Sequence, residues 1–113
     1  MVRHFAVNKT LGFLRLSKER MRVVARRGGR LWVSARLTRQ ARLAVTVRSS
    51  AGTVRRVLYS GPAPRGAHGW RWDGRGTRGK VVRGGVYTIG VRATNELGSV
   101  RLREKVRVVR TRR

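Results

Sequence analysis

The chain contains no cysteine, which excludes disulfide bonds, thiolate catalysis and any zinc site built on cysteine. No apolar run approaches the roughly 18 residues that a membrane-spanning helix needs. Residues 1–5 carry a positive charge, but no apolar segment follows them, so no signal peptide is predicted. If the protein is exported, we expect this chain to be one piece of a longer precursor.

Acidic residues and histidines are nearly as scarce. The four acids are Glu19, Asp73, Glu96 and Glu104. No two of them have the spacing of a paired-carboxylate site, and no serine lies in a recognisable nucleophile motif. The two histidines, His4 and His68, are too few for a metal site, which needs three or four ligands. The sequence therefore predicts no catalytic residue, no metal site and no cofactor, and we do not expect an enzyme.

Lysine and arginine dominate the charged residues of the chain. Lys and Arg number 29 against four Asp and Glu, for a formal net charge of +25. Such a field attracts polyanions, for example anionic cell-wall polymers, acidic polysaccharide or nucleic acid. Compositional bias towards arginine is the alternative origin of the charge, and the attraction would remain in that case too.

Apolar and polar residues alternate with the period of a β-strand, valine is the commonest aliphatic residue, and glycine-rich turns separate the runs. Strands are predicted at residues 11–17, 21–25, 31–38, 42–48, 53–59, 67–72, 86–93 and 99–109. The period is faulty in residues 53–59, which predicts an edge strand or a β-bulge. We therefore expect an all-β, two-sheet sandwich of seven to eight antiparallel strands, with a closed barrel as the alternative.

Three segments follow from this pattern. Residues 1–10 are interpreted as a flexible lead-in or linker, residues 11–109 as the sandwich, and residues 110–113 as a frayed basic tail.

Residues 66–87 hold two of the three tryptophans. Trp70 and Trp72 alternate with polar residues, so both rings should face the same side of one strand. Asp73 and Gly74 then break the strand, and we expect the Asp73 carboxylate to accept backbone N–H groups in the turn. Residues 85–87 start the next strand. The segment is thus predicted to be a corner of the sandwich.

The glycines of this corner, in the pattern Gly74-x-Gly76-x-x-Gly79-Lys80, superficially resemble a phosphate-binding loop. Their order differs from that of the P-loop, and no helix is predicted to follow. A flexible sandwich loop is the better interpretation.

Five quoted segments carry a resemblance to a known family. They are Ala41-x-Leu43-x-Val45-x-Val47, Ser50-Ala51-Gly52-x-Val54-x-x-x-Leu58, Gly66-x-His68-x-x-x-Trp72-Asp73-Gly74, Gly79-Lys80-Val81-Val82-x-Gly84-Gly85-Val86-Tyr87 and Thr94-Asn95-Glu96-Leu97-Gly98. Over residues 11–109 the chain resembles the immunoglobulin-like domain of the flagellar hook-capping protein family, which also occurs as a C-terminal accessory module of secreted actinobacterial-type proteins. The resemblance implies an immunoglobulin-like sandwich with Trp72 in its core. It also implies structural roles for Asp73, Gly74, Gly85 and Tyr87.

The family usually has acidic or amide residues after Trp-Asp-Gly, where this chain has Arg75 and Arg78. A cation site in that loop is therefore not expected. The resemblance implies a non-catalytic structural or adhesive role and implies no particular ligand.

The strongest functional signal is a set of basic residues at outward positions of the predicted strands. These candidates for polyanion binding are Arg36, Arg42, Arg48, Arg92, Arg101, Arg103, Lys105 and Arg107. Trp32 is out of phase with the apolar residues of its strand and is a candidate for stacking on a base or sugar ring.

The leading hypothesis is a monomeric, non-catalytic module of a larger exported bacterial protein, located outside the cell or in its wall and in contact with anionic wall polymers. The alternative is a nucleic-acid-binding protein that uses the same arginines. Its binding would be non-specific, because the sequence has no motif for reading bases.

Overall fold

The computed structural model describes residues 10–24 and 26–111. Turns and loops connect eight strands, and no helix occurs in these ranges. The strands are β1 (Leu11–Leu16), β2 (Arg20–Val24), β3 (Leu31–Leu37), β4 (Ala41–Arg48), β5 (Val54–Ala63), β6 (Gly66–Trp72), β7 (Gly85–Asn95) and β8 (Gly98–Thr111).

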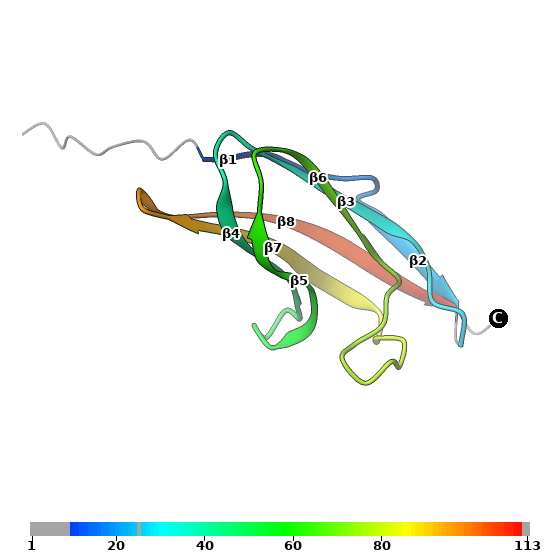
Figure 1. The fold of residues 1–113 in the computed structure, drawn as a ribbon. Helices are drawn as coiled ribbons and strands as arrows, with labels where there is room; N and C mark the ends of the chain where they lie inside the picture. The colour runs from blue at the N-terminus through cyan, green and yellow to red at the C-terminus, as the bar shows by residue number, and fades with distance from the viewer. Residues whose placement is uncertain (1–9, 25, 112–113) are drawn as a thin grey trace, which may run out of the picture.

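The strands form two sheets that lie face to face (Figure 1). The smaller sheet has the order β1-β3-β6, and the larger has the order β2-β8-β7-β4-β5. The two-sheet sandwich is confirmed, and the barrel alternative was wrong.

One pairing departs from the expected antiparallel arrangement, because β2 runs parallel to β8. The crossing between the sheets explains this difference. The Ser17 N–H donates to the Trp32 carbonyl of β3, whereas the Glu19 carbonyl already accepts the N–H of Arg107 in β8. The chain thus passes from the smaller to the larger sheet without reversing, so β2 keeps the direction of β1 (Figure 1).

Alternation along the strands builds the core. In β3 and β4 every second residue is buried, and the buried side chains of the two sheets meet between the layers. Burial of these apolar faces is the main favourable term in folding. Trp72 is the largest fully buried side chain, with an exposed fraction of 0%.

The corner after β6 holds this tryptophan in place. The Trp72 Nε1–H donates to the Arg75 carbonyl at 2.9 Å, and the ring packs at 5.7 Å from Tyr87, between centroids. The Asp73 Oδ1 accepts the Arg75 backbone N–H at 3.0 Å, as expected for an Asx turn. Gly74 has a φ of 80°, and a Cβ there would lie 2.6 Å from Val23 Cγ1, so both conformation and space demand glycine. Gly85 starts β7, which brings Tyr87 inward to meet Trp72.

Several boundaries differ from the predictions. β5 continues through Pro62 to Ala63 instead of ending at residue 59, because its outer edge is unpaired and tolerates a residue without an N–H. The expected irregularity of this strand is confirmed by its edge position and by two register shifts against β4.

The sandwich extends beyond its predicted limits at both ends. Arg110 and Thr111 belong to β8, where they pair with Val23 and Val24, so the basic tail does not start at residue 110. Thr10 is 2% exposed, and its carbonyl accepts the Thr38 N–H, so it belongs to the sandwich. The remainder of the predicted lead-in, residues 1–9, lies outside the described residues.

Candidate polyanion-binding face

The larger sheet collects most of the basic residues singled out from the sequence. Seven of the eight candidates point outward from it, on β4, β7 and β8: Arg42, Arg48, Arg92, Arg101, Arg103, Lys105 and Arg107. We call this surface the basic face. The strand order places β7 between β4 and β8, so the three strands form one continuous surface (Figure 1).

The eighth candidate, Arg36, does not belong to this surface. It is exposed on β3, in the smaller sheet, and points away from the sandwich on the opposite side. Phase within a strand shows which residues point outward, but it does not show which sheet the strand joins.

Two outward arginines of β2, beside the basic face, were missed. Arg20 pairs with Arg107 and Arg22 pairs with Val109, both through the parallel pairing of β2 with β8. Arg20 lies outside the strand predicted at residues 21–25, and Arg22 was not among the candidates. The buried Met21 and Val23 gave the signal that their neighbours face outward.

Glu104 is the one acidic residue on the described strands β2, β4, β7 and β8: it is exposed on β8 between Arg103 and Lys105, opposite Ile89 and therefore in phase with the inward residues. Of the seven cations, Arg48 is engaged, since its Nη1–H donates to the Gly52 carbonyl at 3.0 Å. The other six side chains make no hydrogen bond or ion pair with any described residue. Arg92 lies directly opposite Arg101 in the antiparallel ladder. Like charges at opposed positions repel each other, so a bound anion would relieve this repulsion.

A groove of about 530 Å³ lies in the basic face. Its floor consists of small residues on β4 and β7, namely Ala44, Thr46, Thr88 and Gly90. Its walls are four arginines: Arg48, Arg92, Arg101 and Arg103. The turn between β4 and β5 adds the hydroxyls of Ser49 and Ser50 at one end. The groove therefore offers guanidinium and hydroxyl donors around a shallow floor, which suits phosphate or hydroxylated ligands.

Trp32 lies on the other sheet, 52% exposed. A Cβ at Gly69 would lie 2.4 Å from Trp32 Cζ2, so the indole covers the glycine of the neighbouring strand β6. The side chain thus packs across the strands with one face and leaves the rest of the ring accessible. It is not part of the basic face, so a base stacked on Trp32 would not contact that surface.

His68 takes part in an aromatic cluster at the edge of the sandwich. Its Nε2 lies 2.7 Å from the Pro64 carbonyl, and its ring stacks on Trp70 at 6.1 Å. Tyr59 reaches the same Trp70 from β5. Across the described ranges no three His, Asp or Glu side chains come close enough to hold a metal ion. His4 lies outside the described residues.

None of the described residues forms a helix long and apolar enough to cross a membrane.

No curated protein matches the sequence. Among solved structures 25 chains match, including FlgD from P. aeruginosa. That structure has a TM-score of 0.58 and 18% sequence identity, and the match covers 75% of this chain and 74% of that chain. At this identity the likeness shows the fold alone.

A family model gives the assignment. The model described as the FlgD Ig-like domain matches residues 22–96, which span β2 to β7 and include the Trp72 corner. This match covers well over half of the chain, and the solved structure agrees with it in fold. The chain therefore belongs to the family of FlgD Ig-like domains.

Proposed function

We propose that this domain is a non-catalytic structural and adhesive module of an exported bacterial protein, and that its basic face contacts anionic cell-wall polymers. The observation that carries the proposal is the concentration of seven outward cations on one sheet, against a single exposed acid, Glu104, on the described strands β2, β4, β7 and β8. The FlgD Ig-like domain is a structural domain family, which supports a role without catalysis.

The geometry of the face favours an extended polymer. Arg101, Arg103, Lys105 and Arg107 occur at every second residue of one strand. Their spacing along β8 is about 6.8 Å, from a rise of about 3.4 Å per residue. This is shorter than the Debye length of about 8 Å at physiological salt, so neighbouring charges act together on a ligand. A row of this kind matches a chain with repeated negative charges.

Recognition of a base sequence is not expected from this surface. The described residues include no helix that could enter a major groove, and the groove offers arginines and hydroxyls without an aromatic platform. Attraction to nucleic acid would therefore be generic in sequence. A wall polymer with phosphate groups is the ligand that we propose.

The test uses two triple variants that lose the same charge. In the first, Arg92, Arg101 and Arg103 of the basic face are replaced by glutamine. In the second, Arg15, Arg36 and Arg71 of the smaller sheet are replaced in the same way; all three are exposed there. Binding to poly(glycerol phosphate) is measured by calorimetry from about 50 to 200 mM salt, a range over which phosphate contacts change affinity strongly.

The basic-face variant should bind more weakly and show a smaller salt dependence. The slope of log K against log salt should fall by about 2, since each lost phosphate contact removes about 0.7. The control variant should keep nearly the wild-type slope. Equal effects of the two variants would contradict the proposal and show that the total charge alone attracts the polymer. Tighter binding of DNA or RNA than of poly(glycerol phosphate) at physiological salt would favour the nucleic-acid alternative.

A further inference from the structure

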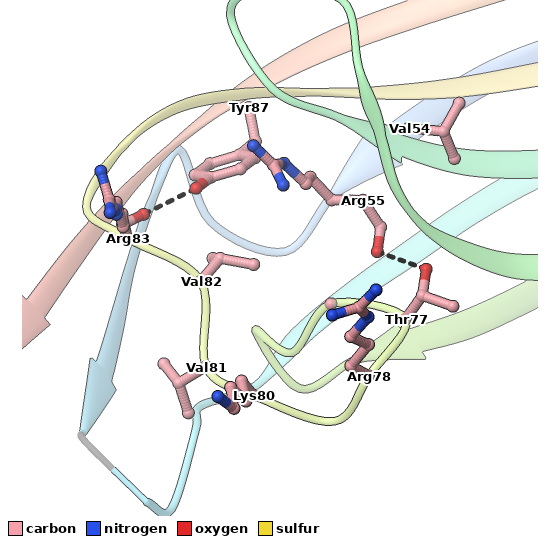
Figure 2. A pocket seen from close by; sticks show the side chains of 10 residues that line it. Val54, Arg55, Thr77, Arg78, Lys80, Val81, Val82, Arg83 and Tyr87 are labelled. Carbon is pink, nitrogen blue, oxygen red and sulfur yellow. Dashed lines mark hydrogen bonds between the residues drawn. The ribbon is translucent and has the colours of Figure 1, made fainter.

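A second cavity lies apart from the groove. It has a volume of about 480 Å³ and opens between the start of β5, the loop of residues 73–84 and Tyr87 of β7 (Figure 2). We call it the loop pocket. It shares no lining residue with the groove of the basic face. Its charged lining residues are all cations: Arg55, Arg78, Lys80 and Arg83.

Other arginines of this region are already engaged in holding the loop. The Arg75 guanidinium donates to the Gly79 carbonyl at 2.7 Å and to the Arg26 carbonyl at 2.6 Å. Arg56 lies 3.7 Å from the Asp73 carboxylate, which Arg75 approaches at 3.8 Å. Asp73 is thus shared by two arginines that do not line the pocket.

The four cations that line the pocket differ from Arg56 and Arg75 in their side-chain contacts. Their side chains make no hydrogen bond and no ion pair with any residue that the structure describes. In Figure 2 Arg55 extends towards Tyr87, and Arg78 rises from the loop below towards Arg55. Lys80 and Arg83 lie further along the same loop and also line the pocket. Two guanidinium groups from different segments, Arg55 of β5 and Arg78 of the loop, thus line one cavity with their donors available.

The loop is fixed by its own bonds. The Gly76 N–H donates to the Lys80 carbonyl, the Gly79 N–H to the Gly76 carbonyl and the Val82 N–H to the Gly74 carbonyl. The Thr77 hydroxyl donates to the Arg55 carbonyl at 2.9 Å and ties the loop to β5. These amide groups are used within the loop, so an anion here would be held by side chains and not by a backbone cradle as in a P-loop.

One wall of the pocket is apolar. Val82 and Tyr87 are buried there, at 8% and 6% exposure, and Val54 closes the other side. The Tyr87 hydroxyl donates to the Arg83 carbonyl at 2.7 Å. Burial raises the pKa of Tyr87 above its ordinary value, against the opposing effect of Arg55 and Arg83, so the phenol stays neutral and does not repel an anion.

We propose that the loop pocket binds the phosphate of a phosphomonoester, held by Arg55 and Arg78, while the adjoining carbon skeleton contacts Val54 and Val82. A phosphomonoester carries about −1.5 to −2 charges at neutral pH, more than a carboxylate or a phosphodiester. Planar guanidinium groups bind such oxygens in a bidentate manner. The ester can come from a free small molecule or from the phosphorylated end of a polymer.

The test is a titration of the protein with glycerol 1-phosphate, followed by amide shifts in nitrogen-15 NMR spectra. Shifts should concentrate at Thr77, Val82 and Tyr87. Arg55→Gln and Arg78→Gln should each weaken binding about tenfold, a factor equal to 1.4 kcal/mol. Arg71→Gln, which removes the same charge from the smaller sheet, should leave binding unchanged. Both pocket variants should unfold at the wild-type temperature, because neither side chain has a described partner to lose.

Glucuronate, which carries one carboxylate on a sugar ring, should bind much more weakly than glycerol 1-phosphate. Equal binding of the two ligands, or wild-type affinity in both pocket variants, would overturn the proposal.

A decamer of thymidine with and without a 5′-phosphate then identifies whether the phosphomonoester belongs to a polymer end or to a free small molecule. A pocket-dependent preference for the phosphorylated decamer indicates a polymer end. Shifts with glycerol 1-phosphate and no such preference indicate a small ester.

Discussion

Arg101→Gln should stabilise the folded domain at low salt. Arg101 lies opposite Arg92 and two residues from Arg103, with no described acid as a partner. Two unit charges about 7–8 Å apart in water repel each other by about 0.5 kcal/mol, so the two neighbours together contribute about 1 kcal/mol. At physiological salt, screening reduces this sum to about 0.4 kcal/mol. The unfolded chain retains part of this repulsion, so the gain in unfolding free energy is smaller than the repulsion energy itself.

The assay is thermal unfolding at about 10 mM and 500 mM salt. A gain of 1 kcal/mol raises the midpoint by about 4–8 °C in a small domain, and this gain should almost vanish at the higher salt. Arg75→Gln is the contrast, because it removes two bonds to backbone carbonyls and should lower the midpoint at both salt concentrations. If Arg101→Gln destabilised the domain equally at both salts, the arginines of the basic face would be structural and the reasoning would be refuted.

Three further predictions concern the corner and the groove. Trp72→Ala should cost about 3–5 kcal/mol in chemical denaturation because it empties the centre of the core, and a loss below about 1 kcal/mol would contradict this role. Tyr87→Phe loses the bond to the Arg83 carbonyl and should cost about 0.5–1.5 kcal/mol at neutral pH. Because burial raises the folded-state pKa of Tyr87 from 10.0, ionisation of the phenol stabilises the unfolded wild type as the pH rises above 10. The difference in unfolding free energy between the wild type and Tyr87→Phe should therefore narrow above pH 10. A constant difference would argue against burial of the phenol. Gly90→Leu keeps the net charge, and its Cβ would lie at an ordinary contact distance of 3.6 Å from Thr46 Oγ1, so the variant should fold. The leucine side chain should fill the groove and weaken polymer binding about tenfold in calorimetry. Unchanged affinity would show that the polymer does not use the groove.

The alternation of side chains made much of the fold predictable. Leu31, Val33, Val45 and Val91 lie in the core because period-two burial is a local property that a single strand displays. The Trp72 corner was also predictable, since Asp73 and Gly74 carry the chemistry of a turn in their own side chains and backbone.

The pairing of strands far apart in the sequence was harder to predict. The parallel contact between β2 and β8 depends on where the chain crosses between the sheets, and no local pattern encodes that crossing. For the same reason, Arg36 of the smaller sheet was grouped with the arginines of the basic face, and Arg20, which lies beside that face, was left out. The loop pocket was missed for a related reason: Arg55 and Arg78 line one cavity because the bond between the Thr77 hydroxyl and the Arg55 carbonyl joins segments 22 residues apart.

The most direct test of the central proposal is a map of amide shifts during titration with poly(glycerol phosphate) at physiological salt. The shifts should concentrate on β4, β7 and β8, around Arg92, Arg101 and Arg103, and leave β3 and β6 almost unchanged. Arg36 and Arg71 provide an internal control, because they are exposed arginines on the opposite sheet. Shifts of equal size on the two sheets would contradict the account and assign the attraction to net charge alone.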